Sequence, residues 1–78
     1  MKQTRGLNTL TEGSSGYVSE IRTTGSMRRR LFDIGLIPGT KVFCLQRSLF
    51  GDPVAFLIRG AVIALRDEDT KDILIQTA

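Results

Sequence analysis

Turn-forming residues recur at short intervals along this chain, and this spacing limits its fold more strongly than any other feature. Clusters of Gly, Ser, Asp and Pro fall at positions 13–16, 38–39, 51–53 and 60. The longest uninterrupted apolar runs, Val54–Ile58 and Ala61–Leu65, contain five residues each. Crossing a bilayer takes about 20 such residues, so we expect no membrane insertion. Short apolar segments between turn signals favour a small fold of closely spaced strands.

The segment Ser26–Ile34 is the one stretch with a clear helical pattern. Its first residue is a favourable N-cap, and apolar residues recur at i, i+4 and i+7 from Met27 onward. Gly35 fits the left-handed position that follows a helix, which would place Leu36 against Leu31. We therefore predict a short helix with a defined C-terminal end.

Five further segments are rich in β-branched and aromatic residues, which is typical of strands. They cover residues 16–23, 40–47, 54–59, 61–66 and 73–77. Val18 and Ile21 are three positions apart, which predicts a bulge in the first strand. We expect Gly60 to kink the chain, and Asp67 to cap a helical turn over residues 67–72.

These elements predict an all-β domain. The expected architecture is a small SH3-like barrel of about five strands, with one short helix between the first and second strands. Residues 1–6 are polar and lack periodicity, so we expect a flexible N-terminal tail before one domain at 7–78. A chain of 78 residues can build one small core but leaves little room for an enclosed active site.

The chain has no His and a single cysteine, Cys44, which excludes most catalytic and metal-binding chemistry. Nucleophile candidates lack the usual general base near neutral pH, so we expect no enzymatic activity. One cysteine cannot form an internal disulfide, and the cytosol is the expected compartment. Cys44 is interpreted as a small buried hydrophobe, because a soft-metal ligand would need partner ligands that the sequence does not place nearby. The acidic run 67–69 is interpreted as a solvated first helical turn rather than a cation site.

A basic cluster, Arg28, Arg29 and Arg30, lies in the first half of a chain whose net charge is +3. Cations in the first turn of a helix oppose the helix dipole, so their position is unusual. Arg29 and Arg30 can pair with Asp33, and one interpretation is a solvated, partly paired helix face. The other interpretation is an electropositive surface that binds an acidic partner.

Two large apolar residues, Leu49 and Phe50, lie beside the turn signal at 51–53, where polar residues are usual. They could fold under the loop and cap the barrel. They could equally project from the loop as an anchor for a partner protein. The sequence leaves both interpretations open.

Several motifs occur in an order that resembles one known family. In chain order they are Leu7, Leu10, Gly13, Gly16-Tyr17-Val18, Ile21, Arg30-Leu31, Ile34-Gly35-Leu36, Pro38-Gly39, Gly51-Asp52-Pro53, Gly60, Ala64-Leu65-Arg66 and Ile73. Together they closely resemble the FeoA family, the small ferrous iron transport proteins A of bacteria. The resemblance implies an SH3-like barrel, a cytoplasmic location and a role beside FeoB, a membrane transporter with an intracellular GTPase domain.

The resemblance also implies where a partner would bind and whether metal is involved. The arginine cluster and the pair Leu49 and Phe50 become the expected contact surfaces for FeoB. Binding of a divalent transition metal, ferrous iron above all, is often associated with the family. The chain has no His and no Cys cluster, so no tight metal site and no firm cofactor is predicted.

A second resemblance supplies an alternative function. The same segments are similar to the SH3-like module of metal-dependent repressors in the DtxR family, which suggests a freestanding barrel that binds nucleic acid or a regulator. The isoelectric point near 9.6 agrees with this alternative. No strand face combines aromatic and basic residues, so we do not expect nucleic acid as the partner. Open strand edges also allow self-association. The favoured prediction is a non-enzymatic cytosolic accessory protein of bacterial ferrous iron uptake that acts by contact with FeoB.

Overall fold

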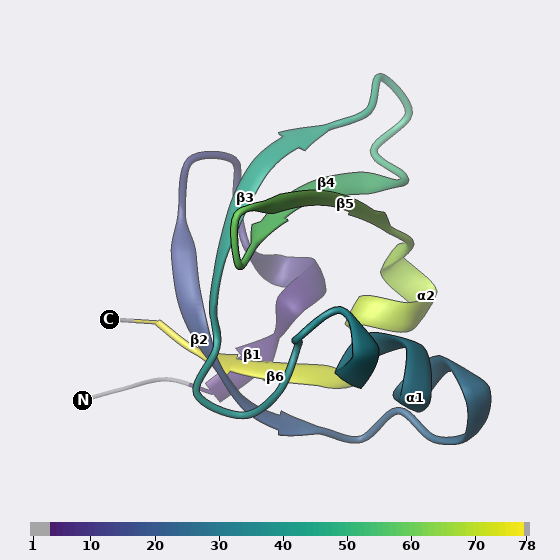
Figure 1. The fold of residues 1–78 in the computed structure, drawn as a ribbon. Helices are drawn as coiled ribbons and strands as arrows, with labels where there is room; N and C mark the ends of the chain where they lie inside the picture. Colours follow the sequence, from purple (N-terminus) through teal and green to yellow (C-terminus); the bar gives the residue numbers. More distant parts are fainter. Residues whose placement is uncertain (1–3, 78) are drawn as a thin grey trace.

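The computed structural model describes residues 4–77, whose strands form one antiparallel sheet that curves around the hydrophobic core (Figure 1). The sheet has six strands in the order β1-β6-β2-β3-β4-β5. Along the chain the elements are β1 (Thr4–Gly6), the 3-10 helix η1 (Leu7–Thr9), β2 (Ser15–Ile21), α1 (Gly25–Asp33), β3 (Lys41–Arg47), β4 (Val54–Ile58), β5 (Ala61–Leu65), α2 (Asp67–Thr70) and β6 (Ile73–Gln76). The all-β prediction is confirmed only in part, because the fold is mostly β and also contains α1, α2 and η1. The predicted helix between the first two predicted strands, which are β2 and β3, is confirmed.

The sheet contains one strand more than the sequence predicts, because Thr4–Gly6 forms β1 within the expected tail. This strand pairs antiparallel with β6, beginning with Thr4 opposite Gln76. Backbone pairing at a sheet edge requires no apolar side chains, so a polar segment carries no pattern that would reveal it. The remaining tail residues 1–3, and Ala78 at the other end of the expected domain, lie outside the described residues.

The bulge expected between Val18 and Ile21 is confirmed. The register between β2 and β6 shifts between Val18 and Glu20. This shift turns both apolar side chains inward despite their odd spacing, and both are buried. The Ser19 hydroxyl, at the bulge, donates a hydrogen bond of 3.1 Å to the carbonyl oxygen of Leu74. The bulge therefore bends β2 without losing its contact with β6.

Helix α1 confirms the predicted C-terminus and corrects the predicted N-terminus. It begins at Gly25, so Ser26 lies inside the first turn and is not the N-cap. Thr24, the residue before the helix, is extended, and Gly25 has a φ of 69°, a left-handed conformation that glycine adopts without strain where the chain turns into the helix. At the other end Gly35 has a φ of 90°, and the Leu36 N–H donates to the Leu31 carbonyl oxygen at 2.9 Å. Both leucines are fully buried, so the helix end is fixed by packing as well as by hydrogen bonds.

Strands β4 and β5 form a tight hairpin, which corrects the kink predicted at Gly60. Arg59 and Gly60 have φ values of 50° and 83°, and the chain reverses so that Ala61 pairs with Ile58. Both flanking strands are apolar throughout, so their pattern does not show whether the chain continues or turns back.

The cap of α2 is also corrected. Asp67 is the first residue of this helix rather than its cap. Its backbone N–H donates to the Asp52 carboxylate at 3.0 Å, and Asp52 belongs to the loop between β3 and β4. The capping carboxylate therefore comes from a residue that is distant in sequence, which local pattern analysis does not detect.

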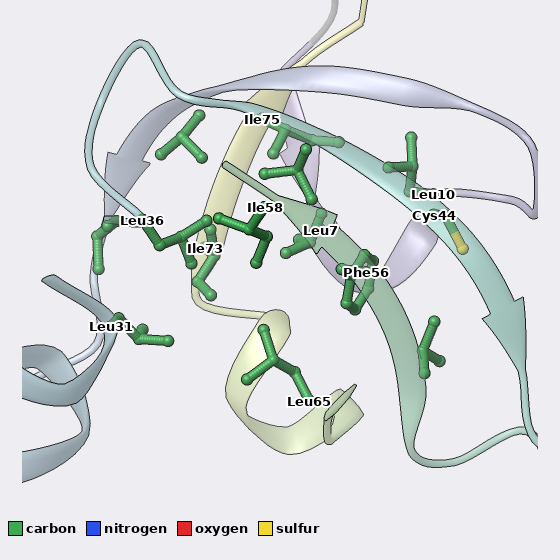
Figure 2. Close-up of a cluster of buried hydrophobic side chains, with 14 residues drawn as sticks. Leu7, Leu10, Leu31, Leu36, Cys44, Phe56, Ile58, Leu65, Ile73 and Ile75 are labelled. Atoms are coloured by element: carbon green, nitrogen blue, oxygen red, sulfur yellow. The ribbon is translucent and has the colours of Figure 1, made fainter. Parts of the chain in front are cut away.

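The hydrophobic core lies between the curved sheet and the helices (Figure 2). It draws on η1, α1 and every strand from β2 to β6, and Cys44 is part of it, as predicted. The buried hydrophobic residues are Leu7, Leu10, Val18, Ile21, Leu31, Leu36, Val42, Cys44, Val54, Phe56, Ile58, Leu65, Ile73 and Ile75. The loops, the outer sheet face and the outer face of α1 are thus left as surfaces open to a partner.

Candidate functional site

The guanidinium group of Arg28 is engaged in contacts within the chain. It donates to the carbonyl oxygens of Ile21 at 2.7 Å and Thr23 at 3.4 Å. The same group lies over the ring of Phe32, 4.7 Å from the ring centre, which is the cation–π distance. Arg28 therefore ties the start of α1 to the end of β2, and the first member of the predicted basic cluster has a structural role.

Arg29 and Arg30 are exposed on α1 and keep their charges available. Within residues 4–77 the ion pairs join Arg22 with Glu20 and Arg47 with Asp67. The predicted pairing of Arg29 and Arg30 with Asp33 is absent from that part of the chain. Helix α1 therefore presents two unpaired guanidinium groups to solvent.

The loop between β3 and β4 presents the two apolar residues that the sequence singled out. Leu49 is 100% exposed and Phe50 is 94% exposed. Neither side chain folds under the loop, so the interpretation as a cap of the barrel is wrong. The tip itself is a tight turn, in which the Gly51 N–H donates to the Ser48 carbonyl oxygen at 2.9 Å.

The base of this loop is firmly attached. Arg47 donates to the carbonyl oxygens of Asn8 and Leu10, both at 2.9 Å. On the other side, the Asp52 carboxylate accepts the first N–H of α2. A fixed base with a projecting tip means that Leu49 and Phe50 are displayed at small entropic cost. Sequence analysis missed Arg47 and Asp52, because their partners lie far away in the chain.

The two predicted contact surfaces do not form one site. The β3–β4 loop projects from one end of the molecule, and α1 lies at the opposite end (Figure 1). A single small partner domain would have to span the whole protein to touch both. The structure therefore separates the arginine cluster from the apolar loop tip.

A third surface, which sequence analysis did not single out, lies on the outer face of β3 and β4. Phe43, Leu45 and Leu57 line a shallow depression of about 330 Å³, with Lys41 and Arg59 at its rim. The sequence signal for this surface is the pattern of β3, where buried Val42 and Cys44 alternate with apolar residues that point outward. Such alternation usually places polar residues outside.

The chemistry of the described residues does not fit a resident metal. Within residues 4–77 no three His, Cys, Asp or Glu side chains gather as a metal-binding group. Cys44 is fully buried, and this burial raises the pKa of its thiol, which keeps the sulfur protonated and poorly suited to bind a cation. The Asp67 carboxylate lies 3.9 Å from the Arg47 guanidinium, which already balances its charge. We therefore derive no function from a bound metal.

Among residues 4–77, no helix has the length and apolar character needed to cross a membrane.

Comparisons with known proteins agree with one another. A model of the FeoA domain matches residues 5–77. The NMR structure of a FeoA-like protein from Clostridium acetobutylicum is 32% identical, with a TM-score of 0.88 over 99% of this chain and 90% of that one. The NMR structure of a FeoA protein from Chlorobium tepidum is 28% identical, with a TM-score of 0.87 over 92% of this chain and 69% of that one.

A third similar structure bears on the fold. It is the zinc complex of FeoA from Stenotrophomonas maltophilia, described as a procaryotic SH3 domain protein. It is 22% identical, with a TM-score of 0.79 over 96% of this chain and 88% of that one, so it supports an SH3-like fold here. The comparison with curated proteins found no match.

Proposed function

Because this chain belongs to the FeoA domain family, whose members are non-catalytic accessory proteins of ferrous iron transport, we propose that it acts by contact with the membrane transporter FeoB. In this proposal the chain is cytosolic, and the β3–β4 loop is its anchor on FeoB. The observation that supports the proposal is the near-complete exposure of Leu49 and Phe50 on a loop with a fixed base.

The loop tip has the chemistry of an interface anchor. Burying one such side chain on association stabilises a complex by about 1.5–3 kcal/mol. Large apolar side chains presented on a preorganised loop lose little entropy when they bind. A cleft lined by apolar side chains on FeoB would accept Phe50, with Leu49 beside it.

The exposed guanidinium groups of Arg29 and Arg30 supply a second, weaker contact in this proposal. They lie at the other end of the molecule, so they would meet a separate acidic region of FeoB. Exposed charges of this kind mainly raise the association rate and are screened by salt. We therefore assign affinity to the loop tip and long-range attraction to α1.

The test is co-purification with detergent-solubilised FeoB. The double variant Leu49→Ser, Phe50→Ser should lose capture while keeping the melting temperature of the unmodified protein. The matched control is Tyr17→Ser, which removes a half-exposed aromatic residue from β2 and should leave capture unchanged. Full capture by the double variant would refute the loop as the anchor. Absence of capture with the unmodified protein would refute contact with FeoB.

A separate measurement distinguishes the alternative of nucleic-acid binding. Binding to a DNA oligomer should be negligible, and the logarithm of any affinity should show no steep dependence on salt. A tight, strongly salt-dependent complex with DNA would overturn the accessory function proposed here.

A further inference from the structure

Strand β5 (Ala61–Leu65) is an open edge of the sheet. It lies last in the strand order and pairs with β4 alone over five consecutive residues. Its sequence, Ala-Val-Ile-Ala-Leu, contains no charge and no proline, and its pairing shows no bulge. A charge, a proline and a bulge are three of the features by which natural sheets protect an exposed edge. β5 has none of them.

The opposite edge of the sheet is protected. β1 spans only three residues, carries Arg5 at its centre, and runs directly into η1. A short, charged edge that ends in a helix offers little template for another strand. The two edges of the sheet therefore differ, and β5 is the one that offers a template for another strand.

The hairpin geometry identifies the backbone groups that β5 leaves free. Arg59 and Gly60 form a two-residue turn, so Ile58 and Ala61 are its first hydrogen-bonded pair. Hydrogen-bonded and non-hydrogen-bonded pairs alternate along antiparallel strands, so the N–H and C=O groups of Val62 and Ala64 point away from β4. Within residues 4–77 these groups have no other backbone partner.

We propose that β5 pairs with β5 of a second copy of this chain, antiparallel about a two-fold axis at Ile63. In this register Val62 of one copy lies opposite Ala64 of the other, and the reverse pair forms by symmetry. Residues opposite each other in a hydrogen-bonded pair exchange both bonds, so two such pairs satisfy every free group of Val62 and Ala64. The strand is therefore complementary to itself, and this register is the one that pairs the free groups of Val62 with those of Ala64 in both copies.

The side chains agree with this register. Val62 is 67% exposed on the outer face. The smaller Ala64 of the partner copy lies opposite, so the larger valine side chain has room beside it. Arg66, just beyond the strand, lies opposite Gly60 of the partner copy, so no like charges face each other. Self-complementarity of this kind favours a second copy over an unrelated peptide, because an isologous contact uses the same surface twice.

This contact uses neither the β3–β4 loop nor α1, so it stands independently of the proposed function. One pair of short strands buries little surface, so the dimer should be weak and should form at high micromolar concentration. It would extend the sheet across both copies and remove the exposed edge from solvent.

Sedimentation equilibrium over a range of concentrations tests the proposal. The unmodified protein should dimerise, and Ala64→Pro should raise the dimer dissociation constant at least about tenfold, because it removes an outward N–H and no bond to β4. Val62→Lys should raise the dimer dissociation constant as well. This variant tests the proposal if the proline variant unfolds. Leu45→Lys is the matched control, since it adds the same charge to the outer face of β3 and should leave dimerisation unchanged.

Amide hydrogen exchange supplies an independent readout. The N–H groups of Val62 and Ala64 should exchange quickly in dilute solution and more slowly as concentration rises. A monomer at about 1 mM would overturn the proposal. So would a dimer that survives Val62→Lys in folded protein, or one that Leu45→Lys disrupts equally, which would indicate stacking of the outer faces.

Discussion

The segment from α1 to Thr40 and the β3–β4 loop are built from similar turns, but their leucine side chains lie in opposite environments. Each contains a glycine of positive φ, Gly35 at 90° and Gly51 at 84°, and each closes through backbone hydrogen bonds. In the first segment the two leucines that fix the helix end, Leu31 and Leu36, are fully buried. In the second, Leu49 is fully exposed and Phe50 almost fully. The comparison shows that one part of the molecule buries large apolar side chains in the core and the other exposes them to solvent.

The largest expected effect tests this division directly. Leu31→Ala should lower the free energy of unfolding by about 2–5 kcal/mol, because it removes a fully buried side chain and leaves a cavity. Leu49→Ala, the same chemical change in the loop, should alter it by no more than about 0.5 kcal/mol. Urea denaturation of both variants measures the difference. A large loss from Leu49→Ala would mean that the loop packs against the sheet after all.

The two glycines sharpen the comparison at a smaller scale. Gly35→Ala and Gly51→Ala each force alanine into a left-handed conformation, at about 1–2 kcal/mol. At Gly35 the added methyl group would also meet the Arg59 side chain, whereas nothing lies within 4 Å at Gly51. Thermal melts should therefore show the larger loss of stability for Gly35→Ala. Equal losses would show that Arg59 moves aside freely.

The same comparison explains which parts of the fold were predictable from sequence. The end of α1 was predictable, because a helical apolar repeat and the Gly35 that follows it lie within a few residues of each other. The cap of α2 was not, because Asp52 reaches it from a separate loop. The Arg59–Gly60 turn was hidden by apolar strands on both sides, and the residues of β1 carry no apolar pattern at all.

The candidate site was predictable in its residue types and not in its geometry. The sequence singles out Leu49 and Phe50 because apolar residues are unusual at a turn, yet a cap and an anchor have the same composition. Only the position of the loop relative to the core shows that the two side chains are exposed. Similarly, the three consecutive arginines look equivalent in sequence, and the carbonyl oxygen of Ile21 distinguishes Arg28 from the other two.

The arginines supply the smallest expected effect. Arg28→Ala should lower the free energy of unfolding by about 1 kcal/mol, because it removes hydrogen bonds to the carbonyl oxygens of Ile21 and Thr23. Arg29→Ala removes the same charge from an exposed position and should change stability by less than about 0.5 kcal/mol. Urea denaturation at two salt concentrations separates the loss of a positive charge from the loss of hydrogen bonds, since screening by salt weakens a charge effect more than a short hydrogen bond. If Arg29→Ala were equally destabilising, the exposed guanidinium groups would be structural, and the assignment of Arg29 and Arg30 to partner attraction would lose its basis.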